Sequence, residues 1–226
     1  MLSALAFQRA NIHGSDFSIW RDTVKKSPSK SRPHNNLCLS YIERKVPESA
    51  VKECSKALEL NPKYVPSRSN LAHIYYQQGM FDDAENELKL AIAITERVRF
   101  PFEDLYRRLG FVYVKKGRLN HAATEFEKAI ALIPDHSDAK RTIAIHYTNE
   151  AWSYTDQGDF PRAILLHRIA VSLDPTYANA HYGLGQAYEA TGQKNTAIRH
   201  WEEYLKLAPL DEPFRKDAMK HLERLR

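Results

Sequence analysis

The chain has 226 residues, of which 43% are hydrophobic and 27% are charged, and only 8 are glycine. This composition favours a soluble, helix-rich protein with enough apolar surface to bury a continuous core. The net charge is +5, and six basic against two acidic residues give +4 within residues 1–34 alone, so the remainder lacks the basic groove of a nucleic-acid-binding protein and we expect no nucleic-acid partner.

The sequence contains no apolar run near the roughly 18 residues that a membrane-spanning helix needs. Its first ten residues, MLSALAFQRA, lack the basic start and the cleavage site of a signal peptide. We therefore expect the chain as given to be soluble, in the cytoplasm or the periplasm. A membrane would be involved only through additional sequence upstream.

Residues 1–30 are expected to form a basic segment followed by the single helix of a half repeat. The helix is predicted over 15–27 (SDFSIWRDTVKKS), where Trp20 takes the bulky position. Ser15 or Asp16 is the expected N-cap, because both side chains can accept a hydrogen bond from the first helical turn.

From residue 31 onward, one pattern of residues returns about every 34 positions, most clearly between residues 70 and 134. The first copy there consists of Leu71, Tyr75, Gly79, Ala84, Leu88 and Ala91, and the second has Leu109, Tyr113, Gly117, Ala122, Phe126 and Ala129 at the same spacing. Large, aromatic, turn and small positions in this order suit two short antiparallel helices with closely approaching backbones. A period of this length is typical of a helical solenoid.

In this register the chain contains five units, at 31–64, 65–98, 103–136, 144–177 and 178–211. Insertions at 99–102 and 137–143 separate the third unit from its neighbours. The second insertion has no Gly or Pro, so we expect it to lengthen the first helix of the fourth unit by about two turns. Residues 212–226 are predicted to form a capping helix with Phe214, Ala218, Met219 and Leu222 turned inward.

The two cysteines, Cys38 and Cys54, fall on the two facing helices of the first unit, so we expect them to lie close together. Two cysteines are too few for a disulfide framework. We expect buried thiols, because a disulfide would require an oxidising compartment.

The repeated pattern resembles that of the tetratricopeptide repeat family, which is large-x2-Leu-Gly-x2-Tyr followed by Gly, Ala, an aromatic residue, Ala and Pro. The resemblance covers residues 31–211. It implies an all-α fold, a right-handed superhelical solenoid of antiparallel helix pairs with about five repeats, an N-terminal half repeat and a C-terminal capping helix. The sequence departs from the pattern at Lys45 in place of a turn glycine, and at Glu150 and His167 in the fourth unit.

The resemblance also implies that the first helix of each pair lines a concave groove. The residues that we expect there to bind a peptide are Asn36, Asn70, His73, Tyr76, Arg107, Arg108, Phe111, Asn149, Trp152 and Tyr182. Asn36, Asn70 and Asn149 share one repeat position, and a carboxamide can pair with any peptide backbone because it both donates and accepts. This is similar to the asparagine ladder of O-linked N-acetylglucosamine transferase and kinesin light chains. The alternative is that these amides bond within their own or a neighbouring helix.

The aromatic residues of this set would anchor a ligand by burying much area at low entropic cost. The alternative is that some of the rings fill contacts between units. For catalysis the sequence offers neither a nucleophile with its base nor a glycine-rich phosphate loop, and its ten histidines form no metal motif. We therefore expect no enzyme activity, no cofactor and no metal.

The sequence thus predicts a non-catalytic scaffold for protein–protein interaction that binds an extended peptide or partner segment in the groove. Two alternatives remain open. The run from Arg9 through Asn11 and Trp20 to Pro28, together with residues 34–37 (HNNL), resembles a junction in mannosyltransferase-like membrane proteins. This resemblance implies an accessory, substrate-presenting domain of a membrane glycosyltransferase. The other alternative is self-association, with the groove of one copy filled by another copy in a homo-oligomer.

Overall fold

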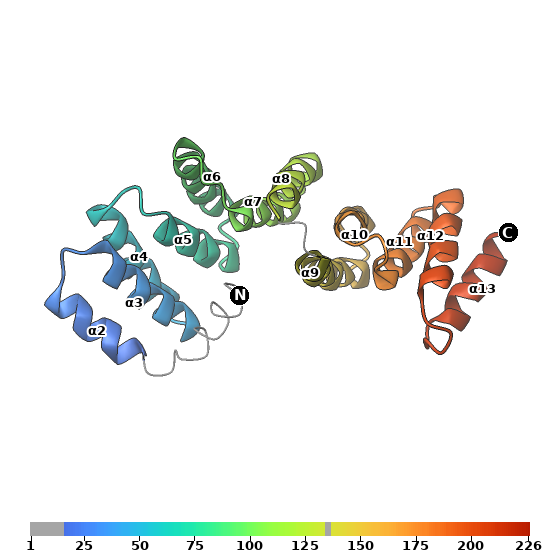
Figure 1. Cartoon of the computed structure of the whole chain (residues 1–226), viewed down its shortest axis with the longest axis horizontal. Coiled ribbons are helices and arrows are strands. Elements are labelled where there is room, and N and C mark those ends of the chain that lie inside the picture. The colour runs from blue at the N-terminus through green and yellow to red at the C-terminus, as the bar shows by residue number, and fades with distance from the viewer. Residues whose placement is uncertain (1–15, 134–136) are drawn as a thin grey trace. The chain divides into compact units, whose positions relative to one another are not determined.

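The computed structural model describes residues 16–133 and 137–226, and within these ranges the chain forms twelve α-helices and no strand (Figure 1). The expected all-α fold is therefore confirmed. Arg9, Ser15 and Pro134 lie outside the described residues. In the described part, no helix combines the length and the apolar character needed to cross a membrane.

The helices fall into two compact units, each larger than one of the predicted repeats. From here on, the first and the second unit mean these two parts of the chain. The first unit, up to Lys116, contains α2 (Asp16–Lys26), α3 (Ser31–Glu43), α4 (Pro47–Leu60), α5 (Val65–Gln77), α6 (Phe81–Arg97) and α7 (Glu103–Lys115). The second unit, from Gly117, contains α8 (Leu119–Leu132), α9 (Ser137–Asp156), α10 (Phe160–Leu173), α11 (Ala178–Ala190), α12 (Lys194–Leu207) and α13 (Arg215–Leu225). Consecutive helices pack as pairs, α3 with α4 and α5 with α6 in the first unit, and α9 with α10 and α11 with α12 in the second.

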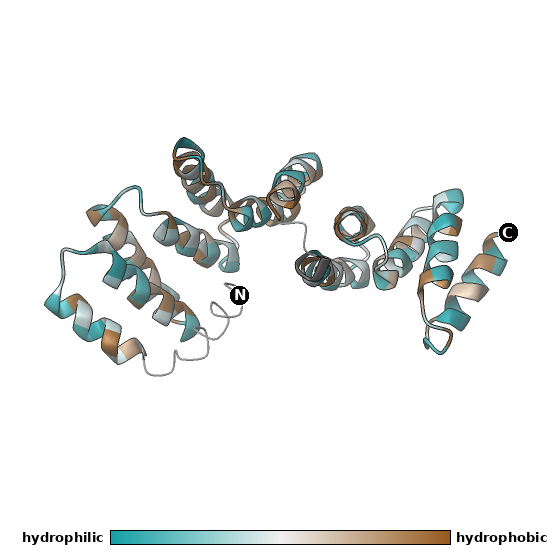
Figure 2. Ribbon diagram, viewed as in Figure 1, coloured by the Kyte–Doolittle hydropathy of each residue, from teal (hydrophilic) through white to brown (hydrophobic). Residues whose placement is uncertain are grey.

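Each helix carries both hydrophilic and hydrophobic residues (Figure 2), as expected of helices that bury one side against neighbours. The first unit buries Cys38, Ala50, Cys54, Leu71 and Ile74 in a common core. In the second unit a core between α12 and α13 is built from Ala197, Trp201, Tyr204, Ala208, Ala218 and Leu222.

The turn inside each helix pair requires a left-handed backbone. Glycines at Gly79, Gly117, Gly158 and Gly192 adopt φ values of 72° to 76° there. Lys45 takes the corresponding place between α3 and α4 with φ 58°. Glycine reaches this region without steric cost, whereas a residue with a Cβ atom does not, so Lys45 is held in an unfavourable conformation.

A recurring side-chain bridge joins the two helices of a pair to the proline that precedes the pair. In each case a residue in the first turn of the first helix contacts a proline carbonyl and a residue of the second helix. The bridges are His34 with Pro28 (3.1 Å) and Glu53 (2.7 Å), Arg68 with Pro62 (2.7 Å) and Glu87 (2.6 Å), and His181 with Pro175 (3.1 Å) and His200 (3.2 Å). They fix the entry of the chain into the pair.

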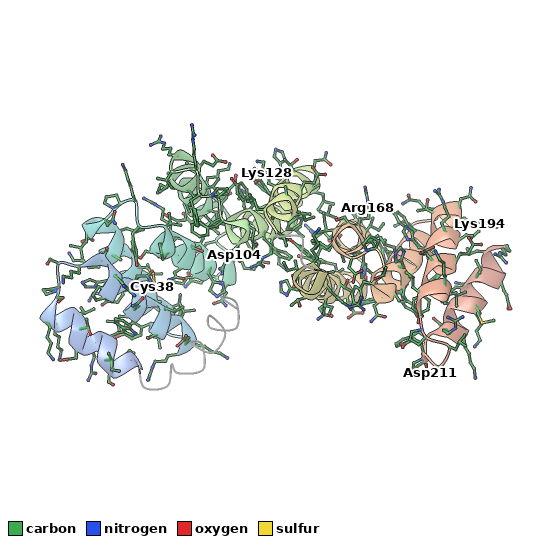
Figure 3. All side chains as sticks on the ribbon, viewed as in Figure 1. Cys38, Asp104, Lys128, Arg168, Lys194 and Asp211 are labelled. Carbon is green, nitrogen blue, oxygen red and sulfur yellow. A yellow bond between two sulfur atoms is a disulfide. The ribbon has the colours of Figure 1, made fainter. Side chains whose placement is uncertain are left out.

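The two cysteines form a disulfide between α3 and α4, with an S–S distance of 2.05 Å (Figure 3). They are close, as predicted, but the expectation of buried thiols is wrong. The Cα atoms of Cys38 and Cys54 lie 5.3 Å apart, within the range that a disulfide bridges, because the two helices approach closely at this crossing. The spacing of the residues indicated this proximity, but it carried no information about oxidation.

The first helix of the fourth unit begins at Ser137 and runs for 20 residues, which confirms the predicted extension. The capping helix α13 is also present, but only two of its four predicted inward residues are buried. Ala218 and Leu222 are buried, whereas Phe214 is 55% and Met219 49% exposed. The helix begins at Arg215, so Phe214 lies just before its first turn and the prediction for Phe214 and Met219 is wrong.

We predict that reduction of the disulfide destabilises the first unit. Closing a loop of this size contributes about 3 kcal/mol to the free energy of unfolding, and the bonded cysteines are 16 positions apart. Urea denaturation with and without a phosphine reductant measures the difference. The matched control is the double variant Cys38→Ala/Cys54→Leu, which reproduces the Ala72–Leu88 pair of the second repeat. Its stability should not change when the reductant is added. Two thiols alkylated in denatured, unreduced protein would contradict the disulfide.

Candidate functional site

The predicted site residues of the first unit lie on α3, α5 and α7, each the first helix of its predicted repeat unit. We call the surface that carries Asn36, Asn70, His73, Arg107 and Arg108 the ladder face. α3 and α5 contact each other directly. All five of these residues are partly exposed.

A buried residue outside the predicted set organises the ladder face. Asn35 is 6% exposed, and its Oδ1 accepts hydrogen bonds from Ser67 Oγ (3.0 Å) and Asn70 Nδ2 (3.1 Å). Its own Nδ2 donates to Asn36 Oδ1 (3.3 Å). The amides of Asn36 and Asn70 are thus joined through Asn35. The two adjacent asparagines, Asn35 and Asn36, were the feature of the sequence that could have indicated this role of Asn35.

These bonds use only one end of the side-chain amides of Asn36 and Asn70, which we call the ladder amides. Asn70 donates through Nδ2 and keeps its Oδ1 as an acceptor, while Asn36 accepts through Oδ1 and keeps its Nδ2 as a donor. The bonds within and between helices that the alternative interpretation expected are therefore present. They leave Oδ1 of Asn70 and Nδ2 of Asn36 for a ligand, and the ladder itself stays a prediction.

Asp104 sets the charge of the α7 side of the ladder face (labelled in Figure 3). It accepts hydrogen bonds from Arg107 and from Nε of Arg108 (2.5 Å). Burial raises the pKa of Asp104, but the charges of Arg108 and Arg107 outweigh it, so that the pKa lies below its ordinary value. Glu103, whose carboxylate lies 3.9 Å from Arg107 Nε, offsets the remaining positive charge, and Arg108 keeps its two terminal nitrogens for other acceptors.

His73 lies within the field of these charges. Burial is the largest effect and lowers the pKa of His73. The positive charge of Arg108 lowers it further, and the negative charge of Asp104 opposes this only in part. The imidazole is therefore neutral at pH 7. Two other predicted residues are less accessible, because Phe111 is 8% exposed and Tyr76 packs edge-on against Phe81 at 5.7 Å.

In the second unit, by contrast with the first, the rings of the predicted site residues Trp152 and Tyr182 are used in packing. Trp152 lies 5.0 Å from His167 and 6.0 Å from Tyr182, measured between ring centroids. Tyr182 also contacts Trp201, Tyr204 and Phe214 at 5.0 to 5.4 Å. Its hydroxyl donates to Asp217 on α13 (2.7 Å), and burial together with this carboxylate raises the pKa of Tyr182. Asn149 is exposed on α9.

His167 explains why the asparagine series ends in the fifth unit, where Gly183 stands at its position. A Cβ atom on Gly183 would lie 2.2 Å from His167 Nε2, so the imidazole occupies the space of any side chain there. His167 is fully buried, and neither ring nitrogen has a hydrogen-bond partner among the described residues. Burial lowers the pKa of His167 to about 3, which keeps the ring neutral.

Comparison with known proteins identifies the repeats. Two models described as tetratricopeptide repeat match residues 41–97 and residues 103–136 and 178–211, and a model described as TPR repeat matches residues 153–192. Together they span more than half of the 226 residues. The chain belongs to the tetratricopeptide repeat family. This tetratricopeptide chain forms the solenoid of helix pairs that its sequence predicts.

Relatives of this tetratricopeptide chain include large proteins. The protein CTR9 homolog of Arabidopsis thaliana is 32% identical over 117 residues, which are 52% of this chain and 10% of the relative. The protein O-mannosyl-transferase TMTC1 of Homo sapiens is 27% identical over 178 residues, 79% of this chain and 19% of the relative. The chain spans between a tenth and half of the length of the curated relatives it matches.

A solved structure shares the fold. YrrB, described as a TPR protein with an unusual peptide-binding site, has a TM-score of 0.58 and 20% sequence identity, with 89% of this chain and 97% of YrrB covered. At this identity the likeness concerns the fold.

We predict that the buried imidazole makes the tetratricopeptide fold sensitive to mild acid. Unfolded His167 takes up a proton near its ordinary pKa of about 6.5, whereas the folded pKa is about 3. Stability is therefore full above pH 6.5 and falls as the pH drops below it, by about 1.4 kcal/mol per pH unit for this group. Urea denaturation between pH 7 and pH 5 measures the slope.

The control for this slope is His167→Leu. The equivalent position of the second repeat is also a leucine, Leu88. His200, whose pKa burial and the neighbouring His181 lower to about 4, contributes to the same slope and remains in the variant. His167→Leu should therefore reduce the slope without removing it. An unchanged slope would show that His167 takes up its proton as readily in the folded protein as in the unfolded one.

Proposed function

We propose that this chain is an interaction scaffold that binds an extended peptide segment of a partner protein along the ladder face. The tetratricopeptide fold is generally a non-enzymatic scaffold for protein interaction, and the family membership supports that part directly. The single observation that carries the finer proposal is the hydrogen-bonded series Asn36–Asn35–Asn70, which holds two ladder amides in fixed orientation.

The fixed amides suit a peptide backbone. Asn70 Oδ1 can accept from a backbone N–H, and Asn36 Nδ2 can donate to a backbone carbonyl. Because Asn35 already orients both side chains, little conformational entropy is lost when a ligand binds, and preorganisation of this kind favours affinity. Backbone pairing is independent of the ligand's side chains, so other groups must supply selectivity.

The charges beside the amides supply one such preference. Arg107 is paired with both Asp104 and Glu103, whereas the terminal nitrogens of Arg108 can form a bidentate pair with a carboxylate of a ligand. A peptide with an aspartate or glutamate near the residues paired to Asn70 is therefore favoured over a basic one. The described peptide-binding site of YrrB, which shares the fold, supports a peptide as the class of ligand.

A second candidate function rests on the similarity to TMTC1. The matching part covers 19% of that protein, so this chain would be the repeat region of a membrane O-mannosyltransferase and would present acceptor proteins to it. Membrane-spanning segments encoded upstream of residue 1 in the same reading frame would support this candidate. A stop codon immediately upstream would contradict it.

We predict that peptides selected for binding use the ladder face. Random 12-residue peptides displayed against the whole chain should yield acidic, extended binders. Asn70→Ala should weaken the selected peptide about fivefold and Arg108→Ala at least about tenfold, because a neutral hydrogen bond contributes less than a hydrogen bond to a charged group. Titration calorimetry measures the affinity, and the melting temperature should change little.

The matched control is Lys56→Ala, since Lys56 is an exposed residue of α4 whose ion pair with Glu59 lies away from the ladder amides. It should leave affinity unchanged. Peptides that bind Asn70→Ala and Arg108→Ala as tightly as the unchanged chain would rule out the ladder face as their site.

A further inference from the structure

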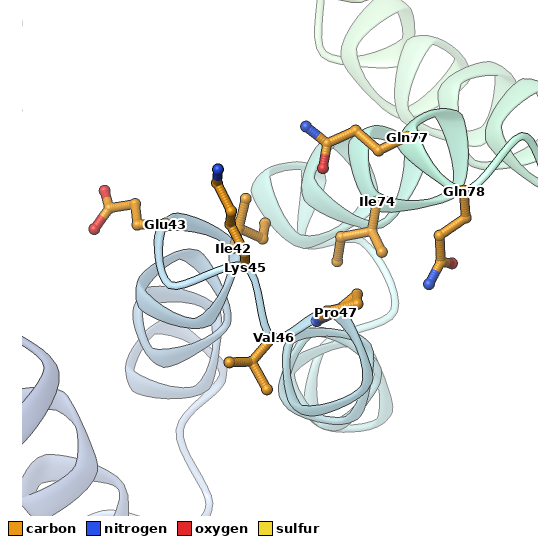
Figure 4. A pocket seen from close by; sticks show the side chains of 8 residues that line it. All are labelled: Ile42, Glu43, Lys45, Val46, Pro47, Ile74, Gln77 and Gln78. Carbon is orange, nitrogen blue, oxygen red and sulfur yellow. The ribbon is translucent and has the colours of Figure 1, made fainter.

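A pocket of about 410 Å³ lies in the first unit, between the turn that joins α3 to α4 and the last turn of α5 (Figure 4). It is lined by Ile42, Glu43, Lys45, Val46, Pro47, Ile74, Gln77 and Gln78. None of these residues belongs to the ladder face. The volume falls within the range of pockets that hold ligands in proteins.

The pocket combines an apolar floor with a polar rim. Ile74 is buried at 2% exposure, Ile42 and Pro47 are partly buried, and Val46 is 38% exposed. The rim consists of Glu43, Lys45, Gln77 and Gln78. Their side chains form no hydrogen bond or ion pair with any other described residue. The pocket can therefore bury an apolar side chain and bind a polar group beside it.

Lys45 is the residue of this rim that the fold does not explain. Four other pairs place glycine at its position, and lysine adopts the left-handed conformation there, with φ 58°, at a steric cost. A residue held in a disfavoured conformation is an indication of function when the fold offers a better choice. Its ammonium group is the one positive charge that lines the pocket.

Figure 4 shows how the rim groups are directed. The side chains of Lys45 and Gln77 extend to the same side of the pocket, whereas the carboxylate of Glu43 points away from it. An ammonium beside a carboxamide suits a carboxylate, which accepts from both donors. Aliphatic side chains below them suit a branched side chain of leucine size.

We infer that this pocket binds a leucine-like side chain of the partner segment together with the carboxylate of an adjacent aspartate or glutamate. The inference rests on the proposed function, because it names the anchor residues of the same peptide. Asn70 and Gln77 are seven residues apart on α5, which places them on one side of the helix about 10.5 Å apart along its axis. An extended segment covers this distance in about three residues.

The test uses two capped dipeptides, acetyl-Asp-Leu-amide and acetyl-Leu-Asp-amide, whose amide ends exclude a terminal carboxylate. They are titrated into the whole chain with labelled isoleucine methyl groups, observed by NMR. We expect saturable shifts at the methyl groups of Ile42 and Ile74. The amide signals of Gln77 and Gln78 should move with the same affinity, while those of Asn36 and Asn70 stay in place.

The decisive variant is Lys45→Gly, which adopts the residue of the other turns and should keep or raise the melting temperature. It should weaken the dipeptide at least threefold, whereas Lys52→Ala, which removes an exposed lysine of α4, should not. Acetyl-Lys-Leu-amide and acetyl-Asp-Ala-amide should bind more weakly than acetyl-Asp-Leu-amide. Each lacks one of the two required groups.

The outcomes separate the pocket from the ladder face. Absence of shifts at Ile42 and Ile74, or shifts unaffected by Lys45→Gly, overturns the pocket and leaves the peptide selection to decide the proposed function. Shifts confined to the surroundings of Asn70 and Arg108 also overturn the pocket while supporting the ladder face. Shifts at the pocket as expected, with no peptide dependent on Asn70 or Arg108, uphold the pocket and overturn binding along the ladder face.

Discussion

The close crossing of two helix backbones within each pair is the constraint on which the rest of this structure depends. One alanine without exposed surface sits at the crossing of each pair that packs within a compact unit, namely Ala50, Ala84, Ala163 and Ala197. A larger side chain would force the two helices apart and displace the first helix of the pair. The ladder face is built from those first helices, so its geometry depends on residues that lie outside it. The bridges from His34, Arg68 and His181 complete the arrangement in three pairs, because they hold those pairs against the chain segment that leads into them.

Much of the fold could be predicted because the crossing requires small residues at fixed spacing, and the turn glycines mark where each pair reverses. The absence of Gly and Pro from 137–143 was sufficient to predict the long α9. The candidate site was less accessible to sequence reasoning. Helical periodicity gives the side of a helix on which a residue lies, but not its rotamer or its partner, so the role of Asn35 and the burial of Phe111 were missed. The state of the cysteines depends on oxidation as well as on distance, and only distance can be inferred from spacing.

The two units use similar helices for different purposes. In the first unit, amides and charged groups of α3, α5 and α7 keep part of their hydrogen-bonding capacity. In the second unit, Trp152 and Tyr182 use their ring surfaces to join neighbouring helices, and His167 fills the space where another asparagine would stand. Aromatic packing of this kind secures the C-terminal end of the solenoid. It also leaves fewer ring surfaces and polar groups exposed there than on the ladder face.

The covalent link between α3 and α4 has a mechanical consequence. Tension applied along the chain passes from Cys38 to Cys54 through the sulfur atoms, so residues 39–53 between them cannot lengthen. At roughly 3.6 Å per extended residue, about 55 Å of contour is withheld from stretching. The pair formed by α5 and α6 has only noncovalent contacts at its crossing and can unravel under the same load. A partner that pulls on this solenoid would therefore meet an extensible array with one inextensible element near its N-terminal end.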